Sequence, residues 1–360
     1  MSLRSAAVLA VALSLAAGLR ASVIFFDKQD NHRQITDKSI QANRSKESSL
    51  GPKKRRIAGK IPMPEQKIYT GVFDAEIVKG RTNFEKAVGS DVAVIAFYQS
   101  WDKKGVFPKR LAEEVVKAKK VLMVTWEPWR ASRSDWDQPE FRLSTIAGGK
   151  HDPYVRQWLS DARDLRAPIF VRFAHEMNGD WYPWGKQANS PQEYVAAWRH
   201  IVDLSRELGA DNITWVWSPN EVTGSETLDP YYPGNDYVDW IGVSGFNWGG
   251  LERWQGWRSY SQIFGPTFEQ IKKYNKPIAI AEISSIENPR AGQQSKAAWI
   301  TETLAAVKTS EPKVSMLIWF NGTFETNNKL YDWTIDGSPA AAQAMKDGLS
   351  DPVFTGRIIK

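Results

Sequence analysis

The stretch Pro168-Ile-Phe-Val-Arg-Phe-Ala-His-Glu176 joins a short apolar run to a carboxylate. An apolar run of this length is typical of a buried parallel strand. A second stretch, Pro277-Ile-Ala-Ile-Ala-Glu282, repeats the arrangement and also places a glutamate where the run ends. Because the carboxyl ends of parallel strands meet at one edge of a sheet, we expect Glu176 and Glu282 to lie on the same face.

From residue 68 onward, short apolar runs alternate with longer amphipathic stretches, which indicates an α/β protein. Eight strands separated by helices over roughly 290 residues predict a (β/α)8 barrel, a TIM barrel, as one domain spanning residues 67–360. A doubly wound open sheet is disfavoured, because the chain has no Gly-x-Gly-x-x-Gly sequence. We expect strands at 69–73, 92–98, 121–126, 169–174, 213–217, 240–244, 278–281 and 315–320, and helices at 108–119, 153–164, 191–208, 260–274 and 294–310.

Tryptophan is the unusual component of this chain, which has 17 among 360 residues, whereas the hydrophobic (42%) and charged (24%) contents are ordinary. A large indole is seldom fully buried, so we expect several of these side chains to line a cleft. The alternative is that a large α/β core uses them as filler. The chain has no Cys and only four His, without a His-Glu-x-x-His sequence. Disulfides and thiolate catalysis are excluded, and we predict no metal and no cofactor.

The first 66 residues differ in composition from the rest. Residues 1–21 combine Arg4, an apolar stretch over 6–19 and small residues, as in a signal peptide; an uncleaved membrane anchor is the alternative. Residues 22–66 are polar and basic and predict a flexible linker. Its run Lys53-Lys-Arg-Arg56 contributes to the net charge of +6 and could also contact an anionic surface. We expect a secreted or periplasmic monomer that binds no nucleic acid.

Aromatic, carboxylate and amide side chains gather at the predicted strand ends. Aromatic rings stack on the C–H-rich faces of sugars, and amides and carboxylates bind hydroxyl groups. Structural roles are the alternative: either glutamate could pair with Arg172, Glu282 could pair with Lys276, and His175 could be a core residue. Besides Glu176 and Glu282, the candidate site residues are His175, Trp181, Trp184, Trp126, Glu127, Asn247, Trp248 and Trp319.

Two carboxyl groups that flank a glycosidic bond are what glycoside hydrolysis requires. The strand-end glutamates, set among side chains suited to sugars, therefore predict an enzyme that cleaves a polysaccharide. The alternative from another class is a barrel that binds carbohydrate without cleaving it. Such a protein would keep the aromatic residues and lose a carboxylate, whereas both glutamates are present here.

The segment Arg172–Gly185, above all His175-Glu-Met-Asn-Gly179, resembles the acid/base motif of glycoside hydrolase family 26. Ala281-Glu282 resembles the nucleophile position of the same family. The resemblance implies a (β/α)8 barrel that acts on β-mannan, mixed-linkage β-glucan or β-xylan. It also implies that Glu176 is the acid/base and Glu282 the nucleophile of a retaining reaction.

The same resemblance implies that His175 orients the carboxylates and that Trp181 and Trp319 are sugar platforms. One position departs from the family pattern, because a Tyr often follows the sixth strand and bonds the nucleophile, whereas this chain has Gly245-Phe-Asn-Trp248. This sequence is more similar to the glucanase-type members, so we expect a β-glucan substrate. An endo-β-1,4-mannanase is the alternative, and trimming of an exopolysaccharide during its synthesis would use the same chemistry.

Overall fold

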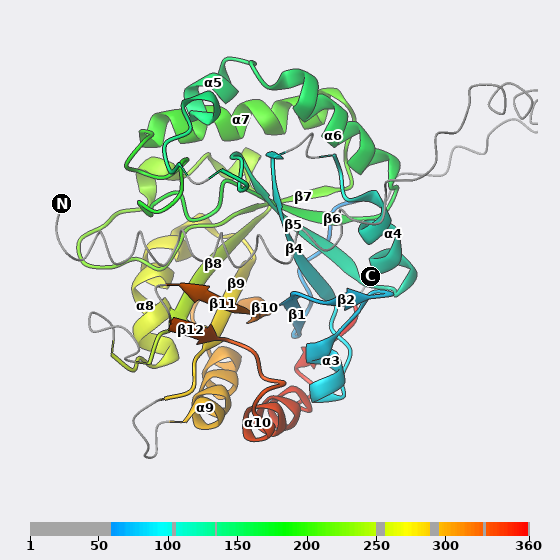
Figure 1. Ribbon diagram of the computed structural model, residues 1–360, viewed down its shortest axis with the longest axis vertical. Helices are drawn as coiled ribbons and strands as arrows, with labels where there is room; N and C mark the ends of the chain where they lie inside the picture. The colour runs from blue at the N-terminus through cyan, green and yellow to red at the C-terminus, as the bar shows by residue number, and fades with distance from the viewer. Residues whose placement is uncertain are drawn as a thin grey trace, which may run out of the picture.

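The computed structural model describes residues 59–102, 106–133, 135–249, 256–288, 295–326 and 329–358. Eight parallel strands close into a barrel, because β10 pairs with both β9 and β1. Helices surround this barrel (Figure 1), and the predicted (β/α)8 fold is confirmed. The barrel strands are β1 (Ile68–Asp74), β4 (Val94–Ser100), β5 (Val121–Glu127), β6 (Ile169–Phe173), β7 (Ile213–Trp217), β8 (Trp240–Asn247), β9 (Ile278–Ser285) and β10 (Val314–Asn321).

All five predicted helices are present, and capping boxes start two of them. The hydroxyl of Ser190 accepts the backbone N–H of Glu193, whose carboxylate accepts the N–H of Ser190 in return. Ser259 and Gln262 repeat this arrangement. The five are α4 (Lys109–Lys117), α6 (Asp152–Asp164), α7 (Pro191–Glu207), α8 (Tyr260–Ile271) and α9 (Lys296–Lys308).

Other elements were not predicted, because they are short or lack apolar periodicity. The connection from β7 to β8, for which no helix was predicted, contains two 3-10 turns. No helix in the described ranges is both long and apolar enough to cross a membrane. The additional elements are α3 (Asn83–Val88), α5 (Leu143–Ala147), α10 (Pro339–Leu349), η2 (Pro139–Phe141), η3 (Asp229–Tyr231), η4 (Asn235–Tyr237), η5 (Lys272–Tyr274), β2 (Ile77–Val78), β3 (Arg81–Thr82), β11 (Thr323–Thr326), β12 (Lys329–Asp332) and β13 (Phe354–Thr355).

Side chains alternate along each strand between the barrel interior and the helix layer. On β6, Ile169, Val171 and Phe173 belong to the large cluster that includes helix residues, whereas Phe170 belongs to the inner cluster. Arg172 therefore points inward, toward the same end of the barrel as Glu176. This alternation decides which residues at the strand ends reach the barrel mouth.

The base of the barrel, opposite the mouth, is closed by the segment that precedes β1. Ile61 is buried in the inner cluster, and its N–H donates to the Thr214 hydroxyl at 2.9 Å. Lys60 pairs with Asp239 at 2.6 Å on the surface nearby. Residues 59–61 thus contact the barrel directly. The predicted signal at 1–21, most of the predicted linker at 22–66 and the run at 53–56 lie outside the described residues.

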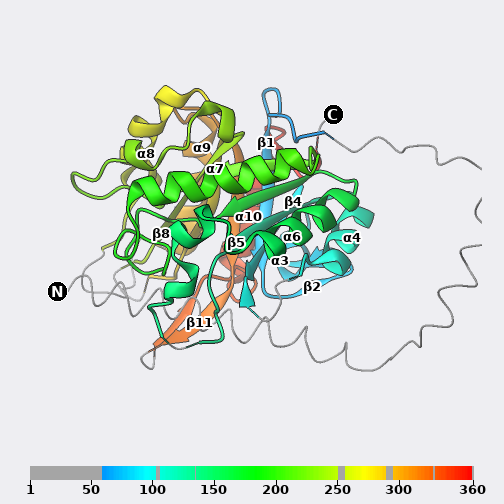
Figure 2. The same cartoon turned by 90° about the horizontal axis from the view of Figure 1, so that it is seen from above.

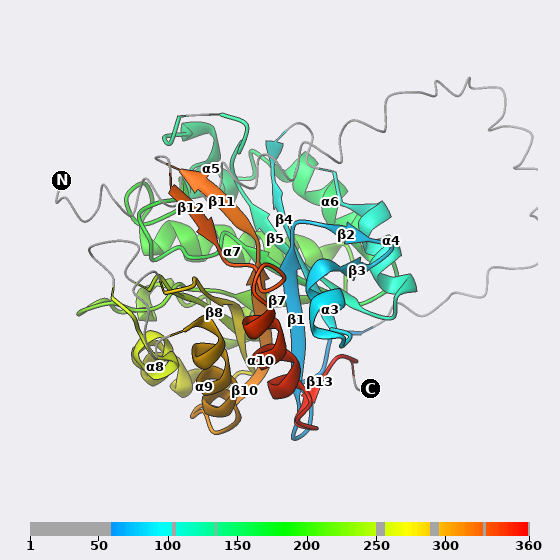
Figure 3. The same cartoon turned by 60° about the horizontal axis from the view of Figure 1, so that its bottom comes forward.

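Two peripheral pairings mark the two ends of the barrel. Strand β13 pairs with the first residues of β1, at the base. The β11–β12 hairpin follows β10 directly, so it lies on the mouth side. Figure 3 shows the two pairings at opposite ends of β1, and Figure 2 shows the hairpin projecting from the barrel on the side away from the C-terminus.

Candidate active site

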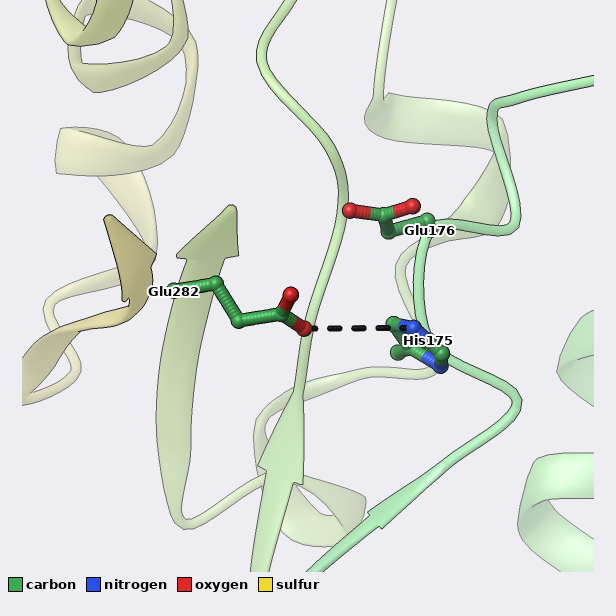
Figure 4. A group of neighbouring side chains, drawn as sticks. All are labelled: His175, Glu176 and Glu282. Carbon is green, nitrogen blue, oxygen red and sulfur yellow. Dashed lines mark ion pairs between the residues drawn. The ribbon is translucent and has the colours of Figure 1, made fainter. Parts of the chain in front are cut away.

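Glu176 and Glu282 lie together at the barrel mouth, as Figure 4 shows. Glu282 is on β9, and Glu176 follows the end of β6. A carboxylate oxygen of each glutamate and a ring nitrogen of His175 all lie within 4.8 Å of one another. Glu176 is 6% exposed and Glu282 is 5% exposed, so both carboxyl groups are largely removed from water. The chain thus brings two carboxyl groups to the separation of a retaining pair, about 5 Å.

A tight turn carries Glu176 out of β6. Ala174 and Glu176 have left-handed backbone conformations, with φ of 44° and 55°, which non-glycine residues seldom adopt. The backbone N–H of Glu176 donates to the carbonyl of Ser218 at 2.7 Å. The indole N–H of Trp184 donates to the carbonyl of His175 at 2.7 Å. These bonds to β7 and to the following loop hold an unfavourable turn in place, as is common at functional sites.

Arg172 neutralises Glu282. The guanidinium is fully buried and donates to Glu282 Oε1 at 2.8 Å. Its other donors reach the hydroxyls of Thr125, Ser218 and Ser244 at 3.2 to 3.3 Å. A buried ion pair is tolerated when its remaining donors are satisfied in this way. The pair places a positive charge directly beside the carboxyl group that would act as the nucleophile.

Among the described residues, Glu176 forms no ion pair with Arg172, and Glu282 forms none with Lys276. Lys276 donates to the backbone carbonyl of Asn235 instead of pairing with Glu282. Because Arg172 already contacts Glu282 Oε1, a cation held by His175 and the two glutamates would have to compete with the guanidinium.

Glu176 lies in a different electrostatic environment from Glu282. Burial, followed by the negative charge of Glu282, raises the pKa of Glu176 to about 8. The indole N–H of Trp181 donates to Glu176 Oε2 at 2.8 Å and opposes part of this increase. Glu176 therefore keeps its proton at neutral pH, whereas the Glu282 carboxyl group is paired with Arg172. A protonated carboxyl group beside one that is paired with a guanidinium can supply an acid and a nucleophile.

His175 is a neutral residue of the site wall. Burial, together with the positive charge of Arg172, places the pKa of His175 well below its usual value. Its Nε2 lies 3.9 Å from Glu282 Oε1, beyond hydrogen-bond distance. The ring packs against Tyr182 at 4.9 Å and Tyr98 at 5.8 Å. The imidazole thus fills the space beside Glu282 without adding a charge.

A third carboxyl group, Glu127, faces the same space from β5. It is 3% exposed, and burial is the main reason that its pKa is raised to about 8. Its Oε2 accepts the indole N–H of Trp129 at 3.3 Å, whereas Oε1 has no hydrogen-bond partner among the described residues. A buried polar atom without a partner is uncommon and is consistent with a position for a ligand hydroxyl.

Tyr98, on β4, was not among the residues selected from the sequence. Its hydroxyl is buried and has no partner of acceptable hydrogen-bond geometry in the described ranges. Burial and the nearby negative charge of Glu282 raise its pKa well above the usual value. The sequence could have identified Tyr98, because alternation along the strand places it on the same inward side as Val94 and Ala96.

Phe246 occupies the position where the family pattern often has a Tyr. Its ring packs against Phe320 at 5.6 Å and Trp333 at 5.1 Å, so it contributes an apolar wall. The groups that adjoin Glu282 are instead Arg172 and Tyr98. The side chains that adjoin the Glu282 carboxyl group therefore come from β6 and β4 instead of β8.

Two of the candidate site residues, Trp126 and the predicted sugar platform Trp319, face away from the mouth. Trp126 stacks on Trp158 of α6 at 4.2 Å, and its indole N–H donates to the Tyr154 hydroxyl. Trp319 belongs to the large cluster that includes helix residues, and its ring lies 6.3 Å from that of Trp299 of α9. Both indoles are buried under helices, because inward and outward residues alternate along a strand. A correction follows: neither ring can stack on a sugar at the mouth.

Three further candidates have structural roles. Trp184 is 1% exposed and stacks on Tyr182 at 4.3 Å, beneath the turn that it holds. The Asn247 side chain bonds Ser285 and the backbone N–H groups of residues 249 and 258, so it shapes the loop after β8. Trp248 is 7% exposed and packs edge-on against Trp333 at 4.8 Å. None presents an open ring face or a free amide, so we remove all three from the expected sugar contacts.

Trp181 is the one predicted platform that is partly exposed and also contacts a catalytic candidate. Together with Glu127 and His175, it surrounds the glutamate pair. A barrel with such a pair at the ends of its strands has the architecture of a glycoside hydrolase. Comparison with known proteins agrees: the model for glycosyl hydrolase family 26 matches residues 151–325, which include both glutamates, and the chain belongs to this family.

Two relatives illustrate the similarity in sequence. Endoglucanase H of Acetivibrio thermocellus is 34% identical over 274 residues, which are 74% of this chain and 28% of that protein. Mannan endo-1,4-beta-mannosidase A and B of Caldalkalibacillus mannanilyticus is 24% identical over 184 residues, 49% of this chain and 32% of that protein. The chain thus matches about a third or less of the length of either relative.

Solved structures share the fold. A GH26 beta-mannanase from Bacteroides ovatus, BoMan26A, aligns with a TM-score of 0.59 at 21% identity, over 81% of this chain and 90% of that one. A modular endo-beta-1,4-mannanase from Cellulomonas fimi gives a TM-score of 0.62 at 19% identity, over 82% and 74%. At these identities the likeness shows the barrel fold alone.

Proposed function

We propose that this chain is a retaining endo-β-glycanase that hydrolyses a β-linked polysaccharide. The observation that carries the proposal is the unequal pair at the mouth. Glu176 is protonated at neutral pH, and Glu282, one oxygen of which lies within 4.8 Å of it, is paired with Arg172. Hydrolysis with retention needs a carboxylic acid and a carboxyl nucleophile at about this separation.

In the first step, Glu282 attacks the anomeric carbon, and the bond to the leaving sugar's oxygen breaks. Glu176 donates its proton to that oxygen, so the leaving chain departs as an alcohol and Glu176 becomes a carboxylate. In the second step, Glu176 takes a proton from water as the water oxygen attacks the anomeric carbon. The ester to Glu282 breaks, and both glutamates return to their starting states.

We propose β-glucan, mixed-linkage or β-1,4-linked, as the substrate. Support comes from the similarity to endoglucanase H, which is the most extensive of the two sequence matches described. The argument from Trp248 no longer contributes, because this ring packs against Trp333 instead of lining the mouth. β-Mannan is the second candidate, favoured by the similarity to a mannan endo-1,4-beta-mannosidase.

A hydrolysis panel tests the activity and the substrate together. Purified protein is incubated with mixed-linkage β-glucan, cellulose, glucomannan, galactomannan and β-xylan, and reducing ends are measured, with Glu282→Gln as the inactive control. The anomeric configuration of the first product, followed by NMR, tests retention. Cleavage of galactomannan tenfold more efficient than of mixed-linkage glucan would overturn the glucan proposal. Binding without cleavage of any polymer would favour the non-catalytic alternative.

Export remains part of the proposal, on the basis of the signal-like residues 1–21. Mass spectrometry of the native protein tests it, because an exported and processed chain lacks Met1 and the apolar stretch after it. An intact N-terminus on active protein found only in the cytoplasm would contradict export.

A further inference from the structure

The loop between β5 and η2 carries an indole that has no role in the mechanism above. Trp136 is partly exposed, and its ring N–H donates to the backbone carbonyl of Trp181 at 3.1 Å. The other tryptophans between residues 126 and 184, apart from Trp181, are buried: Trp126, Trp129, Trp158 and Trp184. Two neighbouring segments thus each leave an indole partly open to solvent beside the mouth.

Hydrogen bonds link the described residues before and after Trp136 in its loop. Gln138 is 1% exposed and bonds both backbone groups of Arg130, accepting from the N–H at 2.8 Å and donating to the carbonyl at 3.2 Å. The same amide donates to the carbonyl of Asp135 at 3.1 Å. The N–H of Ser132 donates to Asp102 at 2.9 Å, which ties the loop to the end of β4. A partly exposed ring between such bonds needs little further ordering to bind a ligand.

The connections of Trp136 place it on the acid side of the site. Its partner Trp181 donates to Glu176, whereas Glu282 is contacted from β6 by Arg172. Glu176 protonates the oxygen that joins the attacked sugar to the leaving chain. A ring linked to the site through Glu176 therefore adjoins the leaving chain.

We propose that Trp136 forms an additional sugar-binding subsite, which stacks on a pyranose of the leaving chain beyond Trp181. The occupant is a further sugar residue of the same polysaccharide, because Trp136 bonds Trp181, which in turn bonds Glu176. An indole face suits the C–H-rich face of a sugar ring. The inference rests on the proposed function and adds that the enzyme binds one more sugar of the leaving chain.

Three variants test the subsite. For Trp136→Ala we expect kcat/KM on the polymer and on long oligosaccharides to fall about tenfold, the factor of one aromatic stacking contact. Hydrolysis of a short aryl glycoside, whose leaving group does not reach Trp136, should stay within twofold. Trp136→Phe keeps an aromatic face and should retain most polymer activity. Tyr274→Ala, which removes a partly exposed ring just before β9 at the base, is the control and should leave both activities unchanged.

The outcomes separate this inference from the proposed function. Equal losses on polymer and aryl glycoside for Trp136→Ala would assign the indole a structural role through Trp181 and overturn the subsite. Full polymer activity in the same variant would also overturn it. A wild-type protein that cleaves no polysaccharide and no aryl glycoside would refute the proposed function itself, whatever Trp136 does.

Discussion

The bond from Trp181 to Glu176 makes a quantitative prediction about the pH dependence of activity. The indole N–H lies 2.8 Å from Glu176 Oε2, within the range of charge-assisted hydrogen bonds. Such a bond favours the ionised carboxylate and so lowers its pKa. Removing it in Trp181→Phe should therefore raise the pKa of Glu176 above its value of about 8.

The size of the change follows from the strength of the bond. Hydrogen bonds to charged groups contribute about 1.5–3 kcal/mol, and one pH unit corresponds to about 1.4 kcal/mol. Because Trp181 is partly exposed, water replaces part of the lost bond, and we expect the lower end of this range. The alkaline limb of the pH profile should move up by about one pH unit.

The measurement is kcat/KM from pH 5 to pH 10, which reports the pKa values of the free enzyme. Loss of a sugar contact in Trp181→Phe lowers the whole curve without moving its limbs, so the two effects separate. Trp136→Phe is the matched control, because its indole N–H bonds a backbone carbonyl and the limb should stay in place. A limb that stays fixed or moves to lower pH in Trp181→Phe would refute the assignment of Glu176 as the acid.

Three further variants test the groups around this pair. Glu176→Ala should reduce polymer cleavage by about three orders of magnitude or more, while azide restores turnover of aryl glycosides with good leaving groups; equal loss on both without an azide effect would contradict the acid role. Arg172→Met leaves Glu282 buried without its partner, so chemical denaturation should show a loss of about 3–5 kcal/mol; a loss under 1 kcal/mol would contradict the pairing. Burial raises the pKa of Glu127 to about 8. The contribution of its bound proton to the free energy of unfolding is therefore fully present below about pH 4.5 and is lost as the pH rises through 8. Glu127→Gln cannot ionise, and its melting temperature relative to wild type should increase between pH 5 and pH 9; a constant difference would show that Glu127 is already ionised.

The sequence was sufficient for the barrel and for the location of the glutamate pair. Each barrel strand is an apolar run bounded by turn residues or by the next helix pattern, and Glu176 and Glu282 end two of these runs. The elements that were missed lack such signals. Helix α3 has six residues, and α10 begins with an Ala-rich segment that shows no clear apolar stripe.

The sequence was less informative about which side chains enter the mouth. Adjacent residues of a strand face opposite layers, so Trp126 lies under α6 while Glu127 faces the glutamate pair. On β10, in the same way, Trp319 packs toward the helices and Phe320 packs inside the barrel. A choice based on residue type favours tryptophan in both pairs, whereas the alternation of the strand selects its neighbour. If Glu127 points into the barrel, its neighbour Trp126 must point toward the helices. The alternation of side chains along the strand therefore excludes Trp126 from the mouth.

The position of Ile61 determines how this domain can be attached to anything else. Residues 59–61 meet the closed end of the barrel, and β13 brings the end of the described chain to the same side. A surface, bead or fused protein joined just before residue 59 or just after residue 358 would therefore connect on the side opposite the glutamate pair. Forms joined at these points should present the glutamate pair to the surrounding solution, where a long polymer chain can reach it.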